Sequence, residues 1–202
     1  MGVVVLGMGS LGAWVGERGF GRPAGAVGRV GGWLMVRANG MTEKHVVKLA
    51  GLRPKDHVVV LGPGPGVGLR WAGKYAAVVV GVDPSKTMLI AAKHRSLDLV
   101  ETGKVQLIQG DAASTHQPDE SANVVLSVNN VHLWPDRQAG LAEVHRILKP
   151  AGRLIIAVHK KWAPHDLAAE ITQAGFTEIT TTTWNPPTRT AGPATILTAQ
   201  KA

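Results

Sequence analysis

The stretch HVVVLGPGPGVG, residues 57–68, decides the fold of this chain. A short run of β-branched residues ends there, and a glycine-rich run follows at once. Glycine has no Cβ atom, so such a run can turn tightly and let a ligand approach the backbone closely. The stretch therefore predicts a buried strand whose carboxyl end leads into a binding loop.

Outward from this stretch, strand-like and helix-like segments alternate along the chain. Two further β-prone segments, 176–183 and 195–200, favour a hairpin at the end of the chain. The alternation predicts an α/β fold: a Rossmann-like, doubly wound sheet of seven strands, mostly parallel, with an antiparallel C-terminal edge strand. We expect the other strands at 57–61, 76–82, 105–109, 122–127 and 153–158, and helices at 69–75, 86–100, 136–148 and 166–174.

Length and composition narrow the class of protein. The chain has 202 residues, which suits a single domain. It contains no cysteine, which excludes disulfides, zinc–thiolate sites and a cysteine nucleophile. Its 22 Lys and Arg against 14 Asp and Glu give a net charge of +8, which attracts anions. The basic residues are spread along the chain, so we expect no stable nucleic-acid partner.

The N-terminal stretch is apolar and rich in glycine. Glu17 and Arg18 interrupt it before the roughly 20 apolar residues that a membrane span needs. It also lacks the basic start of a signal peptide, so we expect a cytoplasmic protein with no membrane span. Gly7, Gly9 and Gly12 spell a dinucleotide-binding pattern, but no acidic residue stands at the required distance.

The chain divides into two parts on this evidence. Residues 1–41 are a Gly-rich segment with the start of a helix, and could form a flap over the site. Residues 42–202 form the main domain. An apolar pattern over 28–52 predicts the helix, with Thr42 as a plausible N-cap and Glu43 in the first turn, where the helix dipole favours an acid.

Polar and glycine residues gather at the ends of the predicted strands. Gly62, Asp83, Asp111 and Asn129 each follow a strand, and ligands of such sheets bind outside the carboxyl ends of the strands. A carboxylate at Asp83 can accept hydrogen bonds from both hydroxyls of a ribose. These features suit any adenosine cofactor, NAD included.

Four motifs sharpen this interpretation, at 58–66, 79–85, 109–112 and 144–154. In this order and spacing they resemble the class I S-adenosylmethionine-dependent methyltransferases, over about residues 42–200. The resemblance implies S-adenosylmethionine as cofactor, S-adenosylhomocysteine as product, and Asp111 at the adenine amino group. It assigns cofactor contacts to Gly62, Pro63, Gly64, Gly66, Asp83, Pro84, Ser85, Gly110, Asp111, Ala112, Ser127 and Asn129.

The chain departs from that family at one position. The family usually carries Asp or Glu two residues before the first glycine, where it helps to hold the methionine end of the cofactor; here Val60 stands in that place. The partner of the cofactor's ammonium group is therefore unassigned.

The methyl acceptor is assigned from residues after the fourth and fifth strands. His132 is our candidate general base for attack by a hydroxyl, with His159 as a second candidate. Asp136 either orients His132 or begins the next helix. Asn130, Trp134, Trp162 and Trp33 could line a site for a sugar ring, so the leading prediction is O-methylation of a polar small molecule or saccharide.

Two other acceptors stay open. The resemblance also extends to enzymes that methylate a carbon of a quinone precursor or lipid, and the basic charge leaves RNA methylation as a third alternative. A binding module that has lost its chemistry is a non-enzymatic alternative. We expect no dedicated metal site, although Asp111 and Asp136 could contribute to one for Mg²⁺. A small-molecule or oligosaccharide acceptor and a monomer or homodimer complete the prediction.

Overall fold

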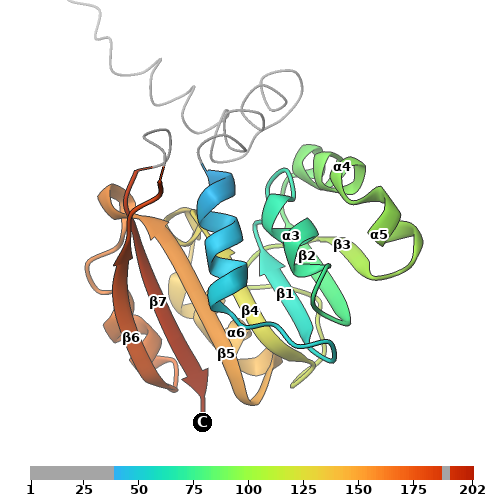
Figure 1. Ribbon diagram of the computed structural model, residues 1–202. Helices are drawn as coiled ribbons and strands as arrows, with labels where there is room; N and C mark the ends of the chain where they lie inside the picture. The colour runs from blue at the N-terminus through green and yellow to red at the C-terminus, as the bar shows by residue number, and fades with distance from the viewer. Residues whose placement is uncertain (1–38, 188–191) are drawn as a thin grey trace, which may run out of the picture.

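A computed structural model describes residues 39–187 and 192–202, and it contains one mixed sheet of seven strands in the order β3-β2-β1-β4-β5-β7-β6 (Figure 1). β1 to β5 are parallel, and β7 pairs antiparallel with both β5 and β6. This architecture confirms the predicted fold class, but the antiparallel strand β7 lies between β5 and β6, and the edge strand at that side is β6. The strands are β1 (His57–Leu61), β2 (Val78–Asp83), β3 (Val105–Gln109), β4 (Ala122–Val128), β5 (Leu148–His159), β6 (Phe176–Trp184) and β7 (Ala194–Lys201).

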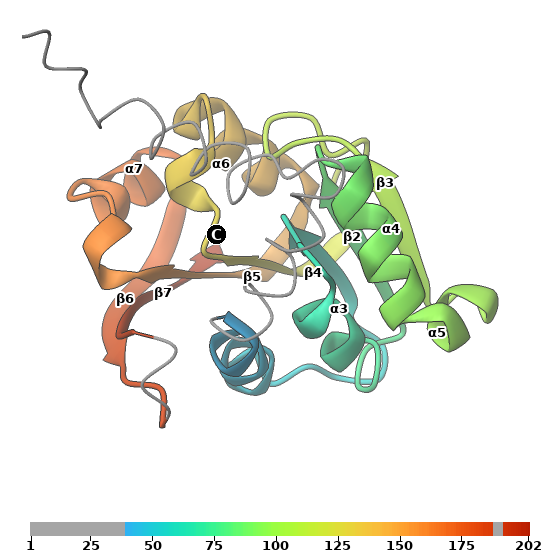
Figure 2. The ribbon, with the colours of Figure 1, turned by 90° about the horizontal axis from the view of Figure 1, so that it is seen from above.

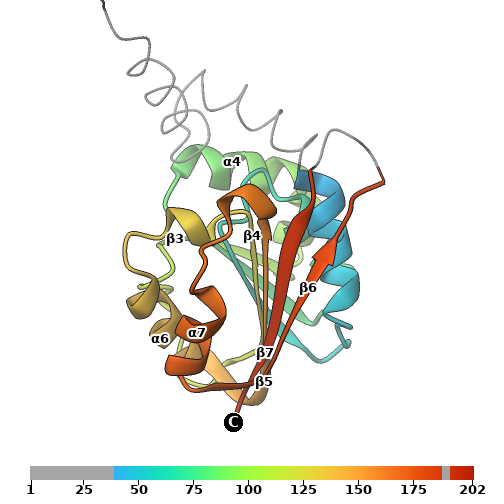
Figure 3. The same cartoon turned by 90° about the vertical axis from the view of Figure 1, so that its left-hand side faces the viewer.

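Helices cover both faces of the sheet (Figures 2 and 3). A helix over residues 39–49 packs with α3 and α4 on one face, and α6 and α7 cover the other. None of the helices in the described ranges is long and apolar enough to cross a membrane. The helices with printed bounds are α3 (Val67–Ala72), α4 (Lys86–Arg95), α5 (Leu97–Glu101), α6 (Arg137–Ile147) and α7 (Leu167–Gln173), with 3-10 turns η2 (Val131–Leu133) and η3 (Lys160–Trp162).

The central strand β1 shows why the sheet is covered twice. Val58 and Val60 belong to the core under the helix over 39–49 and α3. Val59 and Leu61 belong to the core under α6 and α7. Successive side chains of a strand point to opposite faces, so an uninterrupted apolar run is buried only between two layers. The glycine loop after β1 is thereby fixed at the edge of the sheet.

Several predicted boundaries are wrong. The helix predicted over 86–100 is two helices, because Ser96 leaves helical geometry (φ −121°, ψ 27°) and its N–H is shared between the carbonyls of Ala92 and Lys93. The helix predicted over 69–75 instead spans 67–72, directly after the glycine loop. β5 begins at Leu148, where it already pairs with Ala122, and not at residue 153.

The helix before β1 also differs from its prediction. Thr42 lies inside the helix over 39–49, where it is buried, and therefore does not cap it. The proposed boundary between residues 41 and 42 falls within that helix, so a division there remains a prediction. The proposed flap falls almost wholly on residues 1–38, outside the described part of the chain.

Candidate functional site

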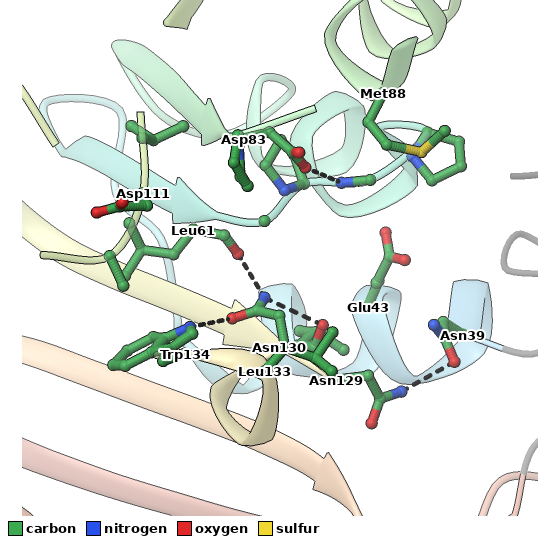
Figure 4. A pocket seen from close by; sticks show the side chains of 18 of the residues that line it. Asn39, Glu43, Leu61, Asp83, Met88, Asp111, Asn129, Asn130, Leu133 and Trp134 are labelled. Carbon is green, nitrogen blue, oxygen red and sulfur yellow. Dashed lines mark hydrogen bonds between the residues drawn. The ribbon is translucent and has the colours of Figure 1, made fainter. Parts of the chain in front are cut away.

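A pocket opens where the carboxyl ends of β1, β2 and β4 meet (Figure 4). The glycine loop forms one wall, the loop after β4 faces it, and the helix over 39–49 borders the pocket as well. Its polar side chains come from Asn39, Glu43, Asp83, Asp111, Asn129, Asn130 and Trp134, and the remaining lining residues are Leu61, Gly62, Pro63, Gly64, Pro65, Val82, Pro84, Met88, Ala112, Val128, Leu133 and Pro135.

Three glycines of the loop take positive φ angles, for different reasons. A Cβ atom on Gly62 would lie 2.7 Å from Nδ2 of Asn130, and one on Gly66 would lie 2.9 Å from the Cα atom of Ala92 in α4. A Cβ atom on Gly64 would meet nothing within 4 Å. The loop is therefore packed tightly at both ends, and its middle is open to the pocket.

Asp83 stands across from this opening. Its Oδ2 accepts a hydrogen bond from the N–H of Gly64 at 3.2 Å, and its Oδ1 accepts one from the N–H of Ser85 at 2.9 Å. Burial raises the pKa of Asp83 to about 6, although both N–H groups act in the opposite direction. Each carboxylate oxygen has a further lone pair for a ligand, as two neighbouring ribose hydroxyls require.

The end of β3 forms the next wall. Oδ1 of Asp111 accepts from the N–H groups of Ala113 and Ser114, both at 3.0 Å, which holds the turn after the strand. Trp134 approaches from the loop after β4, because Gly140 in α6 has no Cβ atom that would clash with its ring. These contacts place Asp111, the predicted partner of the adenine amino group, and the ring of Trp134 together in the lining of the pocket.

Asn130 joins the two sides of the pocket. Its Nδ2 donates to the carbonyl of Leu61 at 2.7 Å, at the end of β1. Its Oδ1 accepts from Oγ of Ser127 and from Nε1 of Trp134, both at 2.8 Å. A second bond from Nδ2, to the carbonyl of Val128 at 3.3 Å, completes its use in fixing the loop after β4 against β1. The substrate contact proposed for Asn130 stays a prediction.

Asn129 ties the same loop to two other elements. Its Nδ2 donates to Oδ1 of Asn39 at 2.9 Å, and its Oδ1 accepts from the backbone N–H of His159 at 2.6 Å. Its φ angle of 54° is one that asparagine tolerates better than most residues. The start of the helix over 39–49 is thus linked to the ends of β4 and β5.

The two candidate bases lie beside the pocket but do not belong to its lining. His132 stacks on Trp162 with 5.2 Å between ring centroids, and His159 contacts the same ring at 5.1 Å. Burial lowers the pKa of both imidazoles, and Lys161 lowers that of His159 further. Nδ1 of His132 is buried with no hydrogen-bond partner in the described residues.

Asp136 does not orient His132. Its Oδ1 accepts from the N–H of Ala139 at 2.9 Å, so it is the N-cap of α6, the second of the two roles considered for it. Within the described ranges there is no group of three His, Asp or Glu side chains that could hold a metal ion.

The other predicted site residues fall into two groups, those that line the pocket and those that support it from behind. Four assigned to the cofactor support the pocket instead of lining it. Gly66 packs on Ala92, Ser85 holds Asp83 and caps α4, Gly110 lies against the carbonyl of Ser114, and Ser127 bonds Asn130. Trp33 lies outside the described residues. The pocket lining contains Gly62, Pro63, Gly64, Asp83, Pro84, Asp111, Ala112, Asn129, Asn130 and Trp134.

Sequence reasoning missed Asn39 and Glu43. Both come from one turn of the helix over 39–49 and point into the pocket (Figure 4). The only signal in the sequence was the missing acid at Val60, which shows that a carboxylate is lacking but not where another could come from.

The family model of a methyltransferase domain matches residues 59–156, from β1 into β5. An uncharacterised methyltransferase of Bacillus subtilis, YdaC, is 28% identical over 162 residues, which cover 74% of this chain and 87% of that protein. The ubiquinone/menaquinone biosynthesis C-methyltransferase UbiE of Ectopseudomonas mendocina is 30% identical over 125 residues, 59% of this chain. That match spans 48% of the UbiE protein, about half its length.

Solved structures agree with the observed fold. A methyltransferase of Thermotoga maritima that depends on S-adenosylmethionine is similar with a TM-score of 0.65 and 22% identity. The similarity covers 94% of this chain and 99% of that one. At this level of identity the likeness shows the fold alone, and the roles of the pocket residues stay a prediction.

Proposed function

Because the chain is a class I S-adenosylmethionine-dependent methyltransferase, we propose that it methylates a carbon atom of an apolar, electron-rich ring, such as a quinone precursor. Bound S-adenosylmethionine supplies a methyl group on a positively charged sulfur, which is already activated for transfer. The protein's contribution is then mainly to hold the two reactants in line and to exclude water.

The residues of the pocket divide this work. Asp83 holds the ribose through its carboxylate, and the slot between Asp111, Ala112 and Trp134 takes the adenine. The open middle of the glycine loop, at Gly64, lets the ligand lie against the backbone. Asn130 keeps the two walls at a fixed separation through its bonds to Leu61 and Trp134.

Two exposed apolar side chains beside the pocket, Leu133 and Trp162, favour an apolar methyl acceptor. Leu133 is 44% exposed and Trp162 is 46% exposed, at the ends of β4 and β5. Exposed large apolar side chains beside a ligand pocket favour a ligand with apolar surface. The similarity to UbiE, a C-methyltransferase by name, supports the same class of acceptor.

O-methylation of a hydroxyl on a polar small molecule or saccharide is the second candidate. It is favoured by His132, whose lowered pKa leaves a neutral imidazole near pH 7. A neutral imidazole can accept the proton that a hydroxyl must lose when it attacks. The neighbouring ring of Trp162 could pack on the face of a sugar.

The two candidates are separated by transfer of labelled methyl groups. The wild type and His132→Ala are incubated with methyl-labelled S-adenosylmethionine and a cell extract divided into lipid, polar and RNA fractions. Carbon methylation predicts label in a quinone-containing lipid fraction that survives the substitution. Label in the polar fraction that His132→Ala abolishes would instead establish O-methylation.

A matched control removes an imidazole that has no place near the pocket. His94 is exposed on α4, so His94→Ala should leave labelling of every fraction unchanged. Label in the RNA fraction would contradict both candidates. It would instead indicate an RNA acceptor, which the net charge of +8 would attract.

A further inference from the structure

The pocket contains a third acidic side chain, which the roles above do not use. Glu43 projects from the helix over 39–49 toward the glycine loop (Figure 4). Its Oε2 accepts a hydrogen bond from the N–H of Gly68 at 2.5 Å. Among residues 39–187 and 192–202, this N–H is the only hydrogen-bond donor recorded for the carboxylate, so Oε1 remains for a ligand.

Glu43 lies near the end of β1, and both line one cavity. A small cavity behind the glycine loop is lined by Glu43 together with Val60, Gly62 and Gly68. The side chain of Val60 is apolar and buried in the core of that face. The carboxylate of Glu43 is therefore the acidic group that stands at this end of the loop, while Asp83 stands beside Gly64.

The two acids suit different parts of one ligand. Asp83 is placed for the ribose, as described above. The cofactor carries one further group that a carboxylate can bind, the α-ammonium group of its methionine end. An ammonium group donates three hydrogen bonds and carries a full positive charge, so a partly buried carboxylate is a strong partner for it.

On this geometry we propose that Glu43 binds the α-ammonium group of the cofactor, in place of an acid on β1. This inference rests on the proposed function, because it needs S-adenosylmethionine as the ligand. It makes the helix before β1 a part of the cofactor site. It also explains how a chain with Val60 at the end of β1 retains a partner for the methionine end.

The surroundings of Glu43 determine when it is charged. Burial raises its pKa to about 7, while the N–H of Gly68 and the charge of Arg95 on α4 lower it. Asp83 on β2 and Asp111 after β3 are the other acids that line the pocket. An arriving ammonium group favours the carboxylate form, so binding near pH 6.5 should release a proton from Glu43.

Two ligands and one substitution test the proposal by calorimetry. S-adenosylhomocysteine carries the ammonium group, and 5′-methylthioadenosine has the same adenosine part without it. Glu43→Gln keeps an oxygen that can accept from Gly68, so the fold should be retained. We expect the substitution to weaken the binding of S-adenosylhomocysteine by about tenfold, the size of one charge-assisted hydrogen bond. The affinity for 5′-methylthioadenosine should not change.

The number of protons released on ligand binding gives a second measurement, which would not change if Glu43 were only structural. Titrations at pH 6.5 in buffers of different ionisation enthalpy should show more protons released with S-adenosylhomocysteine than with 5′-methylthioadenosine. The difference should vanish in Glu43→Gln. Lys48→Gln, an exposed change on the same helix, should retain it.

Each other outcome has a definite meaning. An equal loss for both ligands in Glu43→Gln would make the residue structural and overturn the proposal, as would no loss for either ligand. Failure of the wild type to bind either ligand would reject the cofactor premise itself. That result differs from the first two, in which the wild type binds and only the role of Glu43 is wrong.

Discussion

The two halves of the sheet's carboxyl edge are built differently. At the ends of β1 to β3, turns and backbone contacts make the site: the glycine loop, the hydrogen bonds that hold Asp83, and the turn at Asp111. At the ends of β4 and β5, side chains bridge distant elements, as Asn129 does between Asn39 and His159. The first half is held mainly by hydrogen bonds to backbone N–H groups, whereas the second is held by side chains that join separate elements.

The largest effect is expected in the glycine loop, from Gly66→Ala. This change forces a non-glycine residue to φ 84° and places its Cβ 2.9 Å from the backbone of Ala92. Strain and overpacking together should cost about 4 kcal/mol of unfolding free energy. Urea denaturation measures it, with binding of S-adenosylhomocysteine as a second observable.

Gly64→Ala is the matched control, since its Cβ would meet no protein atom within 4 Å. The strain of its left-handed backbone alone should lower the unfolding free energy by about 1 kcal/mol. The new methyl group should also weaken ligand binding, because it would occupy part of the pocket. Equal losses of stability in the two variants would show that contact with α4 does not constrain the loop.

Asn130→Ala tests the joint between the two halves. It leaves the carbonyl of Leu61 and Nε1 of Trp134 without their bonds, at a cost of about 2 kcal/mol. Asn123 bonds the N–H of His57 at the opposite end of β1, in an exposed position. Asn123→Ala should therefore cost less when both variants are unfolded in urea, and the reverse order would contradict the bridging role.

Asp83→Asn sharpens the comparison by changing affinity more than stability. One oxygen of the amide can still accept a backbone hydrogen bond, but the negative charge toward the ribose is lost. We expect about a tenfold loss of affinity, equal for S-adenosylhomocysteine and 5′-methylthioadenosine, because both contain the ribose. A loss for only one of them in calorimetry would place Asp83 elsewhere on the ligand.

The last prediction is a dependence of stability on pH that arises from Glu43. Its pKa is about 7 in the folded protein, above the ordinary value of 4.5. Between these values the unfolded chain has lost a proton that the folded protein keeps, so Glu43 makes the fold less stable as pH rises from 4.5 to 7.

Glu43→Gln removes this term. Its unfolding free energy relative to wild type should rise across that window and stay constant above it, as urea denaturation at several pH values can show. His132 acts in the opposite direction, because its lowered pKa destabilises the fold as pH falls below its ordinary value of 6.5. It is present in both proteins and cancels in the difference; a flat difference would mean that Glu43 is not buried enough to shift its pKa.

Local signals explain what could be predicted. The glycine run begins where β1 ends, Asp83 is the last residue of β2, and Asp111 follows β3 after one glycine. All three contribute to the pocket. By contrast, the break at Ser96 and the length of α3 were missed, because they depend on how helices pack on the sheet and not on their own periodicity.

The sequence alone determined the layered sheet, because strand and helix periodicities and turn glycines act within a few residues of one another. It also determined the family and predicted an adenosine-binding end of the pocket. Only the tertiary structure decided that Glu43 reaches Gly68, that Asn130 is used up between Leu61 and Trp134, and that His132 stacks on Trp162. These contacts join side chains far apart along the chain, and no spacing in the sequence encodes which of them meet.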